Sequence, residues 1–168
     1  PKTKTPPPSL FILGCVRSGT TLIRNLLLKQ KKIICPQETH YYRYGEPFKT
    51  DSYRNQINQK ILKLHREMDG ISHEEFMKIY RQSRNRRELM EGYVGFMANQ
   101  LGLIDFKWFD KTPQNIYGLP MIMADFPRVK FLSMVRNPLN VVASLKLGKV
   151  IKVKNIHAAC NYWLDSAR

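Results

Sequence analysis

The chain has 168 residues, 43% of them hydrophobic, which is enough for one buried core and excludes a mainly disordered chain. Lys and Arg total 28 against 13 Asp and Glu, so the net charge of +15 indicates anionic partners: nucleotides, sulfated or acidic acceptors, nucleic acid or a membrane surface. The longest apolar runs, such as Leu26–Leu28 and Met121–Met123, fall far short of the roughly 20 residues that a membrane-spanning helix needs.

The first part of the chain predicts a strand, a loop and a helix. Residues 1–9 are rich in proline and lysine and lack apolar periodicity, so we expect an extended tail there. Leu10–Gly14 is typical of a short buried strand, and apolar residues at helical spacing predict a helix over Thr20–Lys29. Ile33–Cys35 predicts a second short strand.

A helical insertion is expected over about residues 51–104. Helical patterning covers Asn55–Met68, Ser72–Ser83 and Arg86–Leu101. The second of these stretches opens with Ser-His-Glu-Glu, the pattern of a capping box.

Strands and helices alternate again after the insertion. We expect, in order, a strand over Lys107–Asp110, a helix over Gln114–Asp125, a strand over Val129–Val135, a helix over Pro138–Leu147 and a last helix from Asn155. Parallel strands need crossover connections, which are usually helical, so the predicted fold is α/β, with an open parallel sheet flanked by helices. Residues 10–168 form one domain in this interpretation. Because the chain starts at Pro1 and stops inside an expected helix, we expect that both ends are cuts and that the domain is incomplete at its C-terminus.

Residues 14–21, Gly-Cys-Val-Arg-Ser-Gly-Thr-Thr, have the spacing of a phosphate-binding P-loop, but Thr20 stands where an ATPase loop has lysine. A glycine-bounded loop that enters a helix offers backbone N–H groups and the positive end of the helix dipole to an anion. Hydroxyls of Thr20 and Thr21 add donors, and Arg17 adds a cation whose planar fork suits phosphate or sulfate oxygens. The alternative is an ordinary strand-turn-helix with a surface arginine.

A second motif begins at Arg136, which ends an apolar strand. Asn137 is suited to cap the next helix, with Pro138 in its first turn. Asn137, Asn140 and Ser144 share one stripe of this otherwise apolar helix, so Arg136 and Ser144 are suited to clamp a phosphate. Helix capping plus a solvent-facing stripe is the alternative for the two asparagines.

These two motifs resemble those of sulfotransferases that use 3′-phosphoadenosine 5′-phosphosulfate. Arg17–Thr21 resembles their 5′-phosphosulfate loop, and Arg136–Ser144 their 3′-phosphate motif. The resemblance covers roughly Leu10–Leu147, implies a P-loop NTPase-like sheet, and is closest to bacterial and tyrosylprotein sulfotransferases. Val16 departs from the proline that is common in that group.

The resemblance also assigns roles to two residues that follow expected strands. Glu38 lies where the tyrosylprotein enzymes have a general base, and Lys111 where they have an active-site lysine. A solvated loop carboxylate is the alternative for Glu38. Four residues each follow an expected strand, and the carboxyl ends of an open parallel sheet share one edge: Arg17, Glu38, Lys111 and Arg136.

The implied reaction moves a sulfuryl group to an acceptor hydroxyl, with Arg17, Glu38 and Lys111 as catalytic residues. The donor is expected to bind at Arg17, Ser18, Gly19, Thr20, Thr21, Arg136 and Ser144. The acceptor stays open between a peptide tyrosine, a sugar hydroxyl and a small alcohol or phenol; the positive charge suits an acidic one. The alternatives are a P-loop nucleotide kinase, or a non-catalytic binder of acidic glycan or nucleic acid, of which a nucleic-acid partner is not expected because no known module is present. The sequence does not indicate an oligomeric state.

Cysteines and histidines do not indicate a metal site. Cys15, Cys35 and Cys160 lack the spacing of metal ligands, so we expect buried free thiols. The four histidines also lack such spacing, so we expect surface or structural roles for them; lining an acceptor pocket is the alternative for His40, which lies near Glu38. Free thiols fit a reducing compartment and hence a cytoplasmic protein; a Golgi-lumenal or membrane-anchored parent chain is the alternative.

Overall fold

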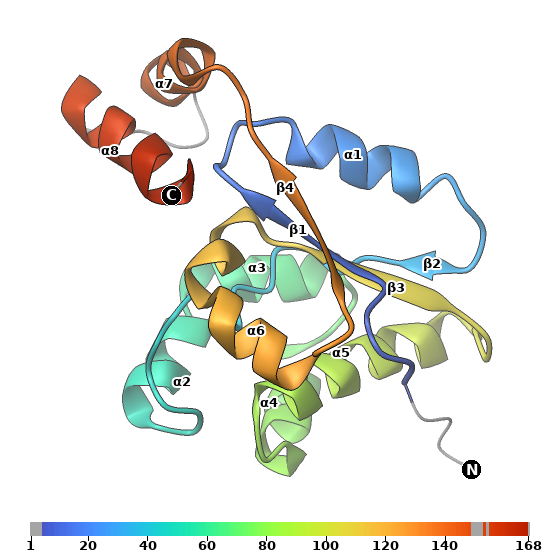
Figure 1. Cartoon of the computed structure of the whole chain (residues 1–168). Helices are drawn as coiled ribbons and strands as arrows, with labels where there is room; N and C mark the ends of the chain where they lie inside the picture. The colour runs from blue at the N-terminus through green and yellow to red at the C-terminus, as the bar shows by residue number, and fades with distance from the viewer. Residues whose placement is uncertain (1–4, 149–152, 154, 168) are drawn as a thin grey trace.

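The computed structural model describes residues 5–148, 153 and 155–167. Its four strands form one parallel sheet in the order β2-β3-β1-β4 (Figure 1). Their bounds are Leu10–Gly14 for β1, Ile33–Ile34 for β2, Lys107–Lys111 for β3 and Lys130–Met134 for β4. The predicted α/β class with an open parallel sheet flanked by helices is confirmed.

β1 is the central strand, because it pairs in parallel with β3 on one side and with β4 on the other. Its side chains alternate between the two faces of the sheet, as the pleat of a strand requires. Phe11 and Leu13 belong to the core that the helical insertion covers, whereas Ile12 packs toward Ile23 and Leu27 of α1. The sheet is therefore the middle layer between two layers of helices.

α1 (Thr20–Leu27) lies on one face of the sheet, and the helical insertion covers the other face (Figure 1). The insertion consists of α2 (Asp51–Ile57), α3 (Lys60–Met68), α4 (His73–Gln82) and α5 (Arg86–Gln100). The predicted capping box is present, because the hydroxyl of Ser72 accepts from the Glu75 amide while the Glu75 carboxylate accepts from the Ser72 amide.

The prediction of a single helix over Asn55–Met68 was wrong, because this stretch forms parts of two helices, with an interruption between α2 and α3. Arg66, buried on α3, donates to the Ile57 carbonyl at 2.7 Å and to the Asn58 side-chain oxygen at 3.2 Å. This guanidinium thus satisfies the Ile57 carbonyl, which is left free where α2 ends. A tertiary contact thus stabilises a break that helical periodicity does not reveal.

The predicted helix over Gln114–Asp125 was only partly right. Pro113–Gly118 forms a 3₁₀ helix, and α6 (Leu119–Asp125) follows it. Pro120 has no N–H to donate to the carbonyl of residue 116, so an α-helix cannot run through this point without losing a hydrogen bond.

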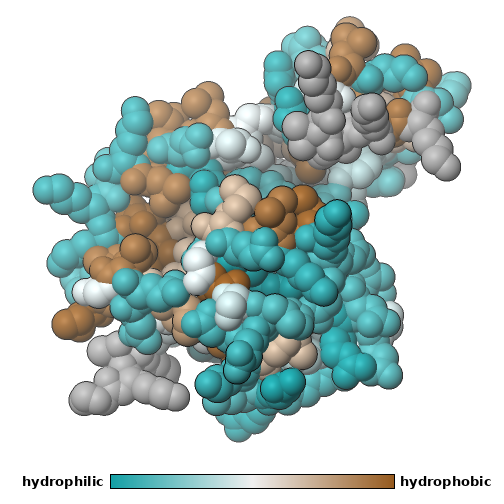
Figure 2. Space-filling model, turned by 180° about the vertical axis from the view of Figure 1, so that it is seen from behind, coloured by the Kyte–Doolittle hydropathy of each residue, from teal (hydrophilic) through white to brown (hydrophobic). Residues whose placement is uncertain are grey.

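Two further helices follow β4. α7 (Pro138–Leu147) has the predicted bounds, and α8 (Ile156–Ala167) matches the predicted last helix. Figures 1 and 2 both show α7 and α8 projecting from the body of the molecule. Seen from behind in Figure 2, hydrophilic residues dominate over α2 and α4, and more apolar residues appear toward α1 and β2.

Cys160 on α8 is exposed, so the prediction of a buried thiol was wrong there, whereas Cys15 and Cys35 are buried and free as expected.

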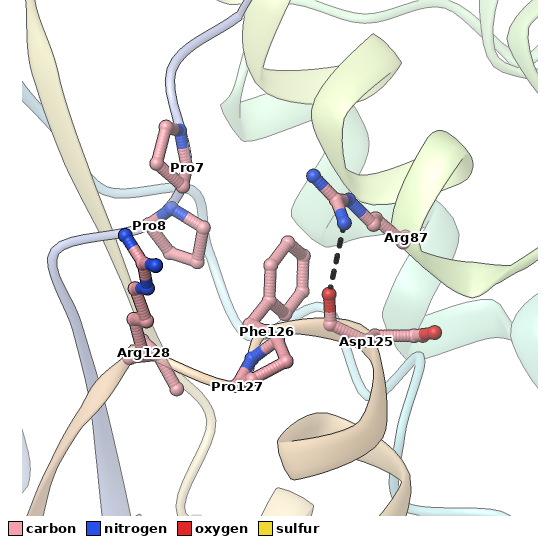
Figure 3. A pocket seen from close by; sticks show the side chains of 8 residues that line it. Pro7, Pro8, Arg87, Asp125, Phe126, Pro127 and Arg128 are labelled. Atoms are coloured by element: carbon pink, nitrogen blue, oxygen red, sulfur yellow. Dashed lines mark hydrogen bonds between the residues drawn. The ribbon is translucent and has the colours of Figure 1, made fainter.

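Residues 5–9 run extended toward β1 and are held by hydrogen bonds; residues 1–4 of the expected tail lie outside the described residues. Thr5 donates to the Glu91 carbonyl on α5, and the Trp108 indole donates to the Pro6 carbonyl at 2.6 Å. Pro7 and Pro8 line a pocket of about 250 Å³ together with Phe126 (Figure 3). This pocket lies where β1 and β4 begin, at the opposite edge of the sheet from the predicted site.

In the same pocket Arg87 donates to the Asp125 carbonyl at 3.2 Å (Figure 3), and it also pairs with Glu91. Arg84 pairs with Glu88. Arg84 and Arg87, near the junction of α4 and α5, are therefore engaged within the chain. No helix within the described residues is long and apolar enough to cross a membrane.

Gly14 ends β1 at a point where a side chain has no room. A Cβ atom there lies 2.5 Å from the carbonyl oxygen of Met134, and Gly14 has a φ of 126°. We expect Gly14→Ala to lower the free energy of unfolding by about 2 kcal/mol or more, because both the strand pairing and the backbone angle oppose the methyl group. Urea denaturation measures this, with Gly45→Ala as control, since nothing lies within 4 Å of a Cβ at Gly45. Equal stability of the two variants contradicts the prediction.

Candidate active site

The loop between β1 and α1 has the shape of an anion cradle. Gly14, Arg17 and Gly19 all have positive φ angles, so the backbone curls tightly before α1 begins at Thr20. The Ser18 hydroxyl is buried and has no hydrogen-bond partner among the described residues. A buried hydroxyl without a partner is costly, so its presence here points to a ligand that supplies an acceptor.

The second predicted motif contacts this loop directly. The Arg17 side chain donates from Nε to the Ser144 hydroxyl at 2.9 Å, and Arg136 donates to the Arg17 carbonyl at 3.1 Å. The contact follows from the sheet register, which places Met134 beside Gly14 at the ends of β4 and β1. The structure therefore brings Arg17 together with Arg136 and Ser144, which lie 119 and 127 positions further along the chain.

The remaining polar residues of this helix serve other roles. Asn137 caps α7, since its side-chain oxygen accepts from the Leu139 amide at 2.9 Å. Asn140 is exposed, while Val141 and Leu145 carry the buried face. Helix capping and solvent exposure thus account for the two asparagines, and Ser144 alone of the predicted stripe contacts the loop among the described residues.

Of the two hydroxyls at the start of α1, Thr20 is buried and Thr21 is exposed. Gly19 is half-buried, and a Cβ there meets only the end of the flexible Met134 side chain, at 4.0 Å. The φ of 95° at position 19 therefore explains the glycine there, and close packing does not. Both ends of the loop have the conformation that glycine favours.

Glu38 and Lys111 form an ion pair at the carboxyl end of β3. Lys111 Nζ lies 2.5 Å from Glu38 Oε1, and the side chains are 6% and 27% exposed, respectively. The second carboxylate oxygen of Glu38 lies 3.5 Å from His40 Nε2. The alternative prediction of a solvated loop carboxylate does not describe Glu38, because the lysine pairs with it in a largely buried setting.

This pairing sets the charge state of Glu38. Burial by itself raises the pKa of the carboxyl group, but the hydrogen bond with His40 and the positive charge of Lys111 outweigh it and lower the pKa to about 2. Burial lowers the pKa of His40, with partial compensation by Glu38. At neutral pH the site thus holds Glu38 as an ionised carboxylate, and its ion pair with Lys111 makes that carboxylate a weak proton acceptor.

One neighbour of Glu38 was not among the sequence candidates. His65 on α3 contacts the Glu38 carbonyl through Nδ1 at 3.0 Å, and its ring stacks on that of His40 with centroids 6.4 Å apart. No sequence signal indicates this contact, because His65 comes from the insertion and reaches the site only through the tertiary fold. The predicted placement of His40 beside Glu38 agrees with the structure.

The described residues contain no group of three or more histidine, cysteine or acidic side chains that could hold a metal ion. The arrangement offers instead a cradle of backbone N–H groups and hydroxyls, two arginines at its rim, and a paired carboxylate and ammonium on the neighbouring strand. Such a set can bind an anionic nucleotide, stabilise negative charge on a transferred group and accept a proton.

Comparison with known protein families identifies the family of the chain. A family model described as the sulfotransferase family matches residues 8–164, which include both motifs and the Glu38–Lys111 pair. No curated protein matches the chain.

The ion pair leads to a prediction about stability. Lys111→Met leaves the Glu38 carboxylate without its cation, so we expect unfolding at pH 7 to become easier by about 2 to 3 kcal/mol. The native pair stabilises the fold above the unfolded pKa of about 4.5, and this contribution is lost as the pH falls toward the folded value of about 2. The cost of the substitution must therefore shrink in acid.

Urea denaturation at pH 7 and at acid pH measures this change, with the double variant Glu38→Gln/Lys111→Met as control. We expect the double variant to recover part of the loss, because it removes the unpaired charge. A cost for Lys111→Met that does not depend on pH contradicts the role of the pair.

Proposed function

The chain belongs to the sulfotransferase family, and on this premise we propose that its sulfuryl donor is 3′-phosphoadenosine 5′-phosphosulfate and its acceptor a hydroxyl compound. The observation that carries the proposal is the contact of the two predicted phosphate motifs, made by Arg17 with Ser144 and by Arg136 with the Arg17 carbonyl. A donor with two separate phosphate groups suits two motifs that meet at one edge of the sheet.

The residues present fit such a donor. The unpaired Ser18 hydroxyl, the loop amides and the start of α1 suit the 5′-phosphosulfate. Ser144 and Arg136 suit the 3′-phosphate, since both side chains lie at the point where α7 approaches the loop. Arg17 belongs to the loop and donates to Ser144 of the second motif. Its side chain is therefore suited to contact the sulfonate as well as the phosphate that binds near Ser144.

The proposed reaction is an in-line transfer of the sulfuryl group. The acceptor hydroxyl oxygen forms a bond to sulfur, the bond from sulfur to the phosphate oxygen breaks, and adenosine 3′,5′-bisphosphate leaves with that oxygen. Glu38 takes the proton of the acceptor hydroxyl. Arg17 and Lys111 stabilise the negative charge on the sulfonate and on the leaving phosphate.

Glu38 needs a change of partner to act as a base. A carboxylate with a pKa of about 2 is a weak proton acceptor, and its hydrogen bond to Lys111 favours the ionised form. Binding of an anionic donor competes for the Lys111 ammonium, and any loosening of the pair raises the pKa of Glu38. Donor binding thus makes the base stronger where and when it is needed.

The acceptor belongs to one of three classes: a peptide tyrosine, a sugar hydroxyl, or a small alcohol or phenol. The net charge of +15 favours an acceptor with acidic groups.

Buried free thiols at Cys15 and Cys35 favour a reducing, cytoplasmic location.

Ligand-induced thermal stabilisation tests the donor. Adenosine 3′,5′-bisphosphate is expected to raise the melting temperature, because a ligand that binds only the folded protein stabilises it. ATP with Mg²⁺ is expected to give no comparable shift, since the loop lacks the lysine of ATP-binding P-loops. The reverse pattern favours a nucleotide kinase and contradicts the proposal.

Substitution of the base tests the chemistry. We expect Glu38→Gln to reduce turnover by about 10²-fold or more while it leaves binding of adenosine 3′,5′-bisphosphate largely intact. Turnover is measured by transfer of labelled sulfate from the donor to members of the three acceptor classes. Glu67→Gln on the exposed side of α3 is the control. Near-normal turnover of Glu38→Gln removes Glu38 from the role of base.

Metal removal provides a further test. Positioned cations and loop amides suffice for a sulfonate, which carries less charge than the γ-phosphate that kinases bind through Mg²⁺. Turnover is therefore expected to be unchanged by EDTA after extensive dialysis. Loss of turnover that returns with Mg²⁺ contradicts this expectation.

A further inference from the structure

Asp110 is a fully buried carboxylate next to Lys111 on β3. Three side chains donate hydrogen bonds to it: Thr39 Oγ1 at 2.9 Å, Thr112 Oγ1 at 3.1 Å and Asn115 Nδ2 at 3.0 Å. Both carboxylate oxygens of Asp110 accept hydrogen bonds in this arrangement. An asparagine in its place would have only one accepting oxygen, because its amide nitrogen donates.

These hydrogen bonds link the two halves of the Glu38–Lys111 pair. Thr39 follows Glu38 in the chain, and Thr112 follows Lys111. The Thr39 amide also donates to Thr112 Oγ1 at 2.9 Å. Asp110 thus fastens the segment that carries Glu38 onto the end of the strand that carries Lys111.

The segment around Glu38 has little regular structure to fix its position. Residues 36–44 contain no helix or strand, and His40 has a φ of 55°. Side chains from other elements hold its backbone instead: the Asp69 carboxylate accepts from the Gln37 amide, His65 contacts the Glu38 carbonyl, and Arg86 donates to the Tyr41 carbonyl. Among these contacts, the Asp110 network is the one that holds Thr39, the residue next to Glu38.

The burial of Asp110 is expensive. Burial raises the pKa of Asp110 to about 6, although its hydrogen bonds and Lys111 oppose the shift. Its raised pKa means that its stabilising contribution is complete below the unfolded pKa of 3.8 and is lost as the pH rises through about 6. Ionisation of Asp110 above a pH of about 6 therefore costs the fold part of this stability.

We propose that Asp110 is a positioning residue that holds Glu38 at hydrogen-bond distance from Lys111 through the Thr39 hydroxyl. The inference rests on the proposed function of Glu38 as base, but the geometry that it concerns exists without substrate. Asp110 touches neither donor nor acceptor in this scheme. It acts through Thr39 and Thr112.

The charged and titratable neighbours of the two carboxylates come from several elements. Lys111, His40 and His65 lie against Glu38, and Tyr162 approaches from α8. Arg43 acts on His40. Lys111 and the Cys35 thiol are close to Asp110. Among these, only Lys111 is close to both carboxylates, so a change in its distance from Glu38 must change the titration of Glu38.

Thr39→Val and Thr39→Ser form a matched pair for the test. Valine has the shape of threonine but no hydroxyl, whereas serine keeps the hydroxyl that Asp110 accepts from. We expect Thr39→Val to lower kcat by about tenfold or more, because small displacements of a reacting group are costly, and to leave the thermal shift by adenosine 3′,5′-bisphosphate unchanged. Thr39→Ser should keep most of kcat.

A second readout does not need turnover. Carboxyl resonances of protein labelled with ¹³C-glutamate are followed as the pH is lowered, and Glu38 is assigned by its loss in Glu38→Gln. In the wild type Glu38 should remain ionised below about 4.3, where an exposed glutamate titrates. The Glu38 midpoint should rise in Thr39→Val and stay low in Thr39→Ser. Thr112→Val serves as a second variant in case Thr39→Val does not fold.

An unchanged Glu38 midpoint in the valine variants, or an equal change in Thr39→Ser, overturns the inference. A wild-type protein that binds the bisphosphate but transfers no sulfate contradicts the proposed function instead. In that case the titration alone decides whether Asp110 positions Glu38.

Discussion

The parallel pairing of β1 between β3 and β4 is the constraint on which the rest of the structure depends. Because the three strands run the same way, their carboxyl ends meet at one edge, and the residues that follow each strand are brought together there. The β1–β4 register puts Gly14 against Met134, so close that no side chain fits at Gly14. The same register lets Arg136 and Ser144 reach the loop that begins at Gly14.

A second consequence is electrostatic. The edge concentrates Arg17, Arg136 and Lys111, and the described part of the chain offers Glu38 as the carboxylate that pairs with Lys111. Arginine side chains are directed at a neutral hydroxyl and a carbonyl, which leaves their charge available to an anion. The ion pair with Lys111 keeps Glu38 ionised, and an anionic donor is the kind of ligand that can weaken that pair.

The sequence predicts those features whose causes are local. The glycines of the loop, Pro138 at the start of α7 and the Ser72 capping box each determine their own neighbourhood, and all were placed correctly. The break after α2 was missed because Arg66 stabilises it from the following helix. Cys160 was misjudged because it lies on the open side of the last helix, where apolar sequence does not imply burial. The contact of His65 and the network at Asp110 depend on the tertiary fold, so no spacing in the sequence reveals them.

In the proposed function the two phosphate motifs form one donor site. Calorimetric binding of adenosine 3′,5′-bisphosphate and of adenosine 5′-monophosphate to the wild type and to Ser144→Ala tests it most directly. We expect the wild type to bind the bisphosphate at least about tenfold more tightly, a difference of about 1.4 kcal/mol, and Ser144→Ala to lose most of this preference. Equal binding of the two nucleotides by the wild type, or a preference that Ser144→Ala leaves unchanged, contradicts it.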